Sequence, residues 1–186
     1  MLFILVAGMP GSGKSVVAAA AREMGIPVYT MGDVVREETL RRFGEVTIEK
    51  MVETSIALRK EFGEDVVAVR TAERALGSNS RVVVIDGVRS LREVEVFARY
   101  GEVAIVAVHA SPKTRFARLL LRKRPGDPAS WEEFRMRDLS ELSLGIGSVI
   151  ALADYVIVNE STLEEALGKA REILRKLAGE HYANKG

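Results

Sequence analysis

Short apolar runs alternate with amphipathic stretches along most of this chain. Five of these runs are rich in branched residues and are bounded by turn residues, and they cover residues 2–7, 27–29, 81–86, 103–109 and 155–158. Runs of this kind, separated by helical patterns, are typical of buried parallel strands. The pattern therefore predicts an α/β fold, a three-layer α/β/α sandwich with a five-stranded parallel sheet in the middle. In such sheets, ligands bind at the carboxyl ends of the strands.

Several helix starts can be located from their capping residues. A capping box places a serine or threonine three residues before a glutamate, and proline is favoured at the first helical position. These signatures occur at Ser90 with Glu93, Ser130 with Glu133, Thr162 with Glu165, and Ser111 with Pro112. Between the second and third strands, residues 39–77 show helical spacing without a strand pattern, which predicts a helical insertion there.

The composition indicates one folded domain over residues 1–186. Hydrophobic residues make up 47% of the chain and charged residues 28%, which excludes a disordered protein. No apolar run reaches the length of a membrane span, so we expect no membrane association. Residues 2–7 follow no basic segment and lead into a glycine-rich loop, so we interpret them as a strand and expect a cytoplasmic protein. The absence of cysteine excludes disulfides and thiol chemistry.

Charge is unevenly distributed along the chain. The formal net charge of +1 gives no general attraction to nucleic acid or membranes. Residues 113–137, however, hold eight basic and three acidic residues, a local net charge of +5. We find no aromatic platform interleaved with these charges, and we interpret Trp131 as a packing residue. Nucleic acid is therefore an unfavoured partner, although the local charge does not exclude it.

Residues 8–15 carry the most specific motif in the chain. They are Gly8, Met9, Pro10, Gly11, Ser12, Gly13, Lys14 and Ser15, which match the P-loop pattern G-x-x-x-x-G-K-S. The motif follows a predicted strand and precedes a predicted helix over residues 16–24, where backbone N–H groups and the helix dipole favour phosphate. We expect the loop to bind ATP or GTP, Lys14 to reach the β- and γ-phosphates, and Ser15 to ligate Mg²⁺. The alternative is a glycine-rich turn before a helix in which the lysine stands by chance. Such a turn would have to match all eight positions of the motif and have both flanking elements.

Asp86 ends the third predicted strand. In P-loop proteins an aspartate at this place holds Mg²⁺, often through water. The alternative is an aspartate that only caps the following turn.

Two further segments resemble nucleoside monophosphate kinases such as adenylate kinase. Residues 30–36, Thr-Met-Gly-Asp-Val-Val-Arg, are similar to their Thr-Gly-Asp-x-x-Arg segment. Residues 86–89, Asp-Gly-Val-Arg, are similar to their Asp-Gly-x-x-Arg element, with the arginine one place early. The resemblance implies that Arg36 and Arg89 hold an acceptor phosphate and that residues 39–77 form an acceptor-binding arm. Asp33 either caps a helix over residues 34–43 or helps to hold the acceptor.

The later half of the chain resembles dephospho-coenzyme A kinase. The similar segments are residues 108–112, the Arg-Leu-x-x-Arg element at 118–122, and residues 153–159. That family has an Asp-x-Asp pair after its second strand, whereas residues 30–33 contain one acid. Over nearly its whole length, the chain resembles most closely an uncharacterised archaeal family of P-loop proteins, which lies between these two kinase families.

This resemblance implies a lid over residues 115–143 with its tip at 124–128. Arg118 would lie against the adenine ring, and Arg122, Arg135 and Arg137 would be candidates for phosphate contacts. Because Arg135 and Arg137 point about 200° apart on a helix, we favour Arg137. We interpret Arg115 and Lys123 as a solvated basic face.

Together these features predict an ATP-dependent kinase. ATP·Mg²⁺ would be the donor, and the acceptor would be a small molecule such as a nucleoside monophosphate or dephospho-coenzyme A. Lys14, Arg36, Arg89, Arg122 and Arg137 form the expected catalytic set. The alternative is a P-loop ATPase or switch that acts on a protein or RNA partner. A monomer and a homodimer are both open.

Overall fold

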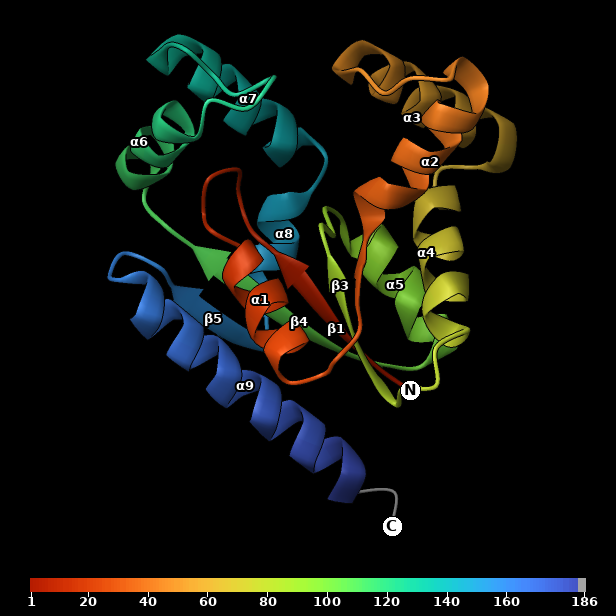
Figure 1. Cartoon of the computed structure of the whole chain (residues 1–186), viewed down its shortest axis with the longest axis vertical. Helices are drawn as coiled ribbons and strands as arrows, with labels where there is room; N and C mark the ends of the chain where they lie inside the picture. The colour runs from red at the N-terminus through yellow and green to blue at the C-terminus, as the bar shows by residue number, and fades with distance from the viewer. Residues whose placement is uncertain (184–186) are drawn as a thin grey trace.

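The computed structural model describes residues 1–183, and it contains one parallel sheet (Figure 1). Its strands are β1 (Leu2–Ala7), β2 (Val28–Thr30), β3 (Val82–Asp86), β4 (Glu102–His109) and β5 (Tyr155–Val158). They lie in the order β2-β3-β1-β4-β5, and every neighbouring pair is parallel. Each predicted run overlaps one strand, and the bounds of run and strand agree to within one residue. The predicted fold class is therefore confirmed.

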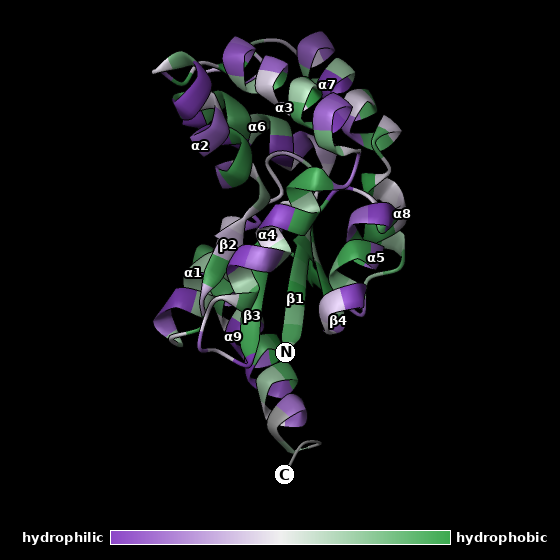
Figure 2. Ribbon diagram, turned by 90° about the vertical axis from the view of Figure 1, so that its right-hand side faces the viewer, coloured by the Kyte–Doolittle hydropathy of each residue, from purple (hydrophilic) through white to green (hydrophobic). Residues whose placement is uncertain are grey.

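Helices cover both faces of this sheet. On one face lie α1 (Ser15–Glu23) and α9 (Leu163–Ala183), and on the other lie α4 (Val66–Leu76), α5 (Leu91–Tyr100) and α8 (Ile146–Ala151). Side chains of β1 alternate between the two cores, since Ile4 packs with α1 and α9 while Leu5 packs with α4 and α5. This double burial explains why the strands are apolar throughout. Figure 2 shows the hydrophobic strands β1 and β3 inside the molecule.

The expected helix caps are present. Serine or threonine side chains accept a hydrogen bond from the backbone N–H three residues later at Ser90, Ser111, Ser130 and Thr162. The reciprocal bonds of Glu93 and Glu133 reach the N–H groups of Arg89 and Ala129, one residue before the cap. Asp33 does not cap a helix, because α2 (Met31–Phe43) starts two residues earlier and Thr30 is at its N-cap position. The capping interpretation of Asp33 is therefore wrong.

The insertion between β2 and β3 consists of helices with two different positions. The helix α4 packs on the sheet through buried residues such as Ala68 and Ala72. The helices α2 and α3 (Ile48–Phe62) extend beyond the carboxyl ends of the strands (Figure 1). Arg42 joins these two helices, because its guanidinium pairs with Glu38 on α2 at 2.6 Å and with Glu61 on α3 at 2.8 Å. Within residues 39–77, only the part before α4 therefore stands away from the sheet.

A second helical pair, α6 (Pro112–Arg122) and α7 (Trp131–Ser143), stands opposite α2 and α3 (Figure 1). Aromatic packing joins α6 to α7, with ring centroids 5.2 Å apart for Phe116 and Trp131 and 5.4 Å apart for Phe116 and Phe134. The packing interpretation of Trp131 is therefore confirmed. The α6–α7 connection reaches α3, because a Cβ placed on Gly126 would lie 2.9 Å from Cδ1 of Ile48. Within residues 1–183, none of the helices has the length and apolar character needed to cross a membrane.

Candidate functional site

The glycine-rich loop lies between β1 and α1, and its backbone is packed closely on its neighbours. A Cβ on Gly8 would lie 2.5 Å from the carbonyl oxygen of Val108. Gly13 has a φ of 91°, and a Cβ there would lie 2.2 Å from Nδ2 of Asn159. A side chain at position 8 would collide with the backbone of β4, and one at position 13 would be strained by the positive φ and would displace the Asn159 side chain. The motif glycines therefore let the loop lie against β4 and the end of β5.

Lys14 closes the loop on itself. Its ammonium donates a hydrogen bond to the carbonyl oxygen of Gly8 over 2.6 Å. Burial lowers the pKa of Lys14, while the nearby carboxylates of Asp86 and Glu141 favour its charged form. The loop thus holds a half-buried cation at the carboxyl end of the sheet.

Asp86 lies beside this cation at the end of β3, level with Val6 of β1. Burial raises the pKa of Asp86, and the charge of Lys14 opposes that rise. Its Oδ1 is buried and has no hydrogen-bond partner among the described residues, so the structure gives no support to a turn-capping role. An unpartnered carboxylate oxygen beside a phosphate loop fits a Mg²⁺ ion, which prefers oxygen ligands. Ser15, the other expected ligand, is exposed at the first position of α1.

A cavity of about 150 Å³ lies above Lys14. The loop, the segment after β3, both helices α6 and α7, and the start of α8 all contribute to it. Its lining residues are Gly8, Pro10, Gly11, Lys14, Gly87, Val88, Arg89, Arg122, Arg137, Glu141 and Ile146. The structure thus brings together four of the five expected catalytic residues, Lys14, Arg89, Arg122 and Arg137. Cations from the loop, the segment after β3, α6 and α7 surround one small space.

Arg36 is the fifth, and it lies elsewhere. It is exposed on α2 and makes no hydrogen bond or ion pair with a residue of the described chain. Between the two candidates on α7, Arg137 lines the cavity, whereas Arg135 is exposed and is not part of its lining.

Arg118 lies on another side of the loop. Its Nη2 donates to the carbonyl oxygen of Asn159 at 2.9 Å, and its Nη1 lies 3.5 Å from the carbonyl oxygen of Ser12. Asn159 itself is buried and donates from Nδ2 to the same Ser12 oxygen at 2.9 Å. Sequence reasoning had given Asn159 no role of its own. Its position shows that the residue after β5 anchors the loop.

Arg115 corrects an expectation, because it is not part of a solvated face. Only 4% of the residue is exposed, and its guanidinium lies over the ring of Phe134 at 4.9 Å. It donates to the carbonyl oxygens of Ala110 at 3.1 Å and Pro10 at 3.2 Å. The helical repeat carried this signal, since Arg115 stands four residues before the buried Leu119 and therefore on the same face of α6. Lys123 is exposed, as expected.

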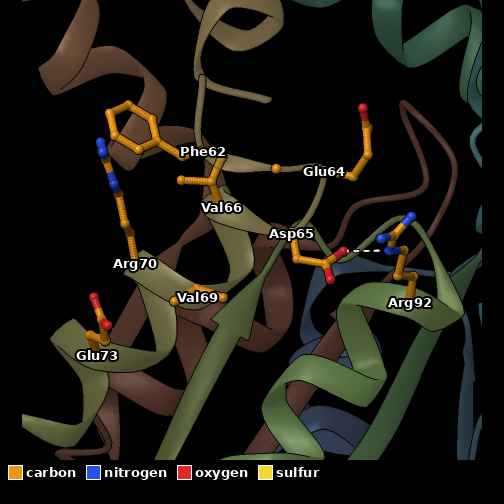
Figure 3. A pocket seen from close by; sticks show the side chains of 9 residues that line it. Phe62, Glu64, Asp65, Val66, Val69, Arg70, Glu73 and Arg92 are labelled. Atoms are coloured by element: carbon orange, nitrogen blue, oxygen red, sulfur yellow. Dashed lines mark ion pairs between the residues drawn. The ribbon is translucent and has the colours of Figure 1, made fainter. Parts of the chain in front are cut away.

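A larger cavity of about 350 Å³ lies where α4 meets the start of α5 and the α3–α4 connection (Figure 3). Its two arginines already have partners. Arg92 pairs with Asp65 at 2.6 Å, and Arg70 lies over the ring of Phe62 at 4.7 Å. No residue of the glycine-rich loop lines this cavity. Four of the residues expected to act on phosphate therefore meet at the smaller cavity above Lys14, and none of them lines this larger one.

Known proteins resemble this chain over most of its length. A family model described as "AAA domain" matches residues 7–135. A "UPF0200 protein" of Staphylothermus marinus is 59% identical over 177 residues, which are 95% of this chain and 93% of that protein. This chain belongs to the AAA domain family and to the UPF0200 family. The resemblance to an archaeal P-loop family is thereby confirmed.

Two solved structures show the same fold as the UPF0200 chain. A gluconokinase from Sinorhizobium meliloti superposes with a TM-score of 0.60 at 21% identity, covering 98% of this chain and 97% of the other. A shikimate kinase from Bacteroides thetaiotaomicron superposes with a TM-score of 0.58 at 19% identity, covering 96% and 98%. This chain therefore has the fold of P-loop kinases.

Proposed function

We propose that this protein binds ATP·Mg²⁺ and transfers the γ-phosphoryl group to a small phosphorylated acceptor, either a nucleoside monophosphate or a molecule like dephospho-coenzyme A. The carrying observation is the cavity above Lys14, where the loop lysine meets arginines from three other segments. A protein that only binds a nucleotide needs the loop alone to hold the phosphates. Converging cations from four segments suit a transferring phosphoryl group, whose charge must be neutralised from several directions.

The donor half of the proposed site is the loop. Backbone N–H groups of the loop, which every residue from 11 to 15 can supply, bind the phosphates, and Lys14 supplies the charge between the β- and γ-phosphates. Ser15 and Asp86 would hold Mg²⁺, which supplies neutralisation of the phosphate charge. The unpartnered Oδ1 of Asp86 supports that fit. Within the described chain no cluster of three acidic or histidine side chains could hold a metal alone, so the ion would bind together with the nucleotide. Arg118 would lie beside the base.

The acceptor half is the side of the cavity toward Arg89. The Arg89 side chain is 53% exposed, and its Nε lies 3.5 Å from a carboxylate oxygen of Glu141. Its guanidinium fork suits a phosphate of the acceptor. Arg36 on α2 would reach the same molecule from the arm, which requires movement of the arm or a long acceptor.

Residues 115–143 would act as a lid that excludes water. Arg122 and Arg137 belong to it and already line the cavity, and Gly126 at its tip lies against Ile48 of the arm. In-line transfer then depends on positioning and charge neutralisation, with the acceptor oxygen attacking phosphorus as the bond to the β-phosphate oxygen breaks.

The test is an incubation with ATP·Mg²⁺ or GTP·Mg²⁺ and a panel of nucleoside monophosphates and dephospho-coenzyme A, followed by detection of the phosphorylated acceptor. Lys14→Ala should abolish turnover. Arg36→Ala should impair transfer while it spares ATP binding, and Arg81→Ala, at the opposite end of β3, should do neither. ATP hydrolysis that is equal with and without every acceptor would contradict the kinase proposal and support an ATPase. If Arg36→Ala weakened ATP binding as much as Lys14→Ala, the two phosphate sites would not be separate.

A further inference from the structure

Asp127 lies in the connection between α6 and α7, and its side chain is only 4% exposed. Its Oδ2 accepts hydrogen bonds from Nε of Arg122 at 2.8 Å and from the backbone N–H of Arg124 at 3.0 Å. Its Oδ1 accepts from Nη2 of Arg122 at 2.5 Å and from Nη1 of Arg137 at 3.3 Å. One buried carboxylate therefore joins the last residue of α6 to the middle of α7.

The two arginines that share this carboxylate both line the cavity above Lys14. Cations that line one small cavity repel one another, and Arg89 adds a further positive charge. A carboxylate between two guanidinium groups offsets that repulsion. Hydrogen bonds, the largest from Arg122, lower the pKa of Asp127 to about 2, so this offsetting charge is present at neutral pH.

Enough donors remain on the two arginines for a ligand. A guanidinium carries five N–H groups. Arg122 binds Asp127 through Nε and Nη2, and its Nη1 has no hydrogen-bond partner within residues 1–183. Arg137 uses Nη1 for Asp127 and for the carbonyl oxygen of Gly126 at 2.9 Å, and in the same described part of the chain its Nε and Nη2 have no partner. The carboxylate thus holds both groups without consuming their capacity to bind phosphate.

We propose that Asp127 is a positioning residue that holds Arg122 and Arg137 side by side, so that both present free donors to a phosphate bound above Lys14. This inference rests on the proposed function of the loop. The competing explanation is that Asp127 only ties the turn through the N–H of Arg124. The two explanations differ in whether Asp127 acts through its charge on the arginines.

Asp127→Asn separates them, because the amide oxygen can still accept from Arg124 while the charge is lost. We expect the dissociation constants of ATP·Mg²⁺ and of inorganic tripolyphosphate to rise about tenfold or more, since the arginines lose their shared partner. Calorimetry or the emission of Trp131, the single tryptophan, measures both. The matched control is Asp65→Asn, which removes a different aspartate–arginine pair and should leave both constants unchanged.

A second background tests whether Asp127 acts through the arginines. In Arg122→Met/Arg137→Met, the further change Asp127→Asn should not weaken binding again. An unchanged affinity for Asp127→Asn alone would overturn the inference. An equal loss in both backgrounds would also overturn it, since Asp127 would then act on the loop and not on the arginines.

A readout without nucleotide keeps this inference distinct from the proposed function. Phenylglyoxal modifies free guanidinium groups, and peptide mass spectrometry follows each arginine separately. Asp127→Asn should speed the modification of Arg122 and Arg137 severalfold, and Asp65→Asn should leave their rates unchanged. If the wild-type protein bound neither ATP nor tripolyphosphate while these rates rose, the proposed function would fail and the arginine pairing would stand. Unchanged rates would overturn the pairing itself.

Discussion

The guanidinium of Arg115 on α6 forms a two-point ion pair with the carboxylate of Asp138 on α7, with N–O distances of 2.7 and 2.5 Å. The same guanidinium donates to the carbonyl oxygen of Pro10 in the glycine-rich loop. Along α7, Asp138 directly follows Arg137 and stands three residues before Glu141. Both of these neighbours line the cavity. This pair therefore fixes how α7 faces the loop.

Loss of one partner should be costly because the other charge stays buried. We expect Arg115→Ala to lower the free energy of unfolding by about 3–5 kcal/mol, the range for a broken buried ion pair. The double variant Arg115→Met/Asp138→Leu should recover much of that loss. Denaturant titration measures both, and Lys123→Ala on the exposed side of the lid is the control. A loss below about 1 kcal/mol for Arg115→Ala would show that the pair is solvated.

Asn159 should tolerate alanine better than aspartate. Asn159→Ala removes the hydrogen bond to the carbonyl oxygen of Ser12, which costs about 1 kcal/mol of stability. Asn159→Asp instead places a carboxylate against that oxygen, so two acceptors face each other and the loss should be larger. Measurements of thermal unfolding and of ATP affinity both test this expected difference between the two variants. Equal stability of Asn159→Asp and the wild-type protein would contradict this role.

Glu141 should oppose phosphate binding through its charge. It lines the cavity, its side chain is 14% exposed, and Lys14 and Arg89 are near it. Glu141→Gln keeps the shape and removes the negative charge, so we expect the dissociation constant for tripolyphosphate to fall severalfold. Glu132→Gln, on an exposed residue of the same helix, should have no such effect. Weaker binding by Glu141→Gln would indicate that Glu141 instead contacts the ligand or its metal.

Asp86 should reduce the stability of the free protein at neutral pH. Its pKa is raised by burial even with Lys14 nearby, so the native state favours the protonated form. Such a group adds stability below its unfolded pKa, and that contribution is lost as pH rises through the folded pKa. Asp86→Asn should therefore raise the melting temperature at pH 7, and the melting temperature should decline less as the pH rises above 4. The same variant should weaken the Mg²⁺ dependence of ATP binding. A lower melting temperature at pH 7 would contradict this assignment.

Much of the fold follows from local pattern. The five strands appear in the sequence because both faces of the sheet are buried, which requires nearly continuous apolar runs. The phosphate loop can be predicted from the sequence equally well, since its glycines, Lys14 and Ser15 stand at a fixed spacing between a strand and a helix. Helix starts at Ser90, Ser111 and Ser130 could be read because capping acts within four residues.

Only the tertiary structure decided which charges meet. Arg115 and Asp138 are 23 residues apart, and Asn159 reaches Ser12 across 147 residues. Helical spacing places Arg115 on the buried face of α6, but it does not show that Arg115 packs against the loop. Sequence spacing also did not indicate that Arg36 stands away from the cavity, or that Asp127 holds two of the predicted phosphate ligands. The sequence by itself determined the sheet and the loop, because periodicity and capping are local. The charge pairs depend on how α6 and α7 dock above the loop, and long-range packing alone sets that arrangement.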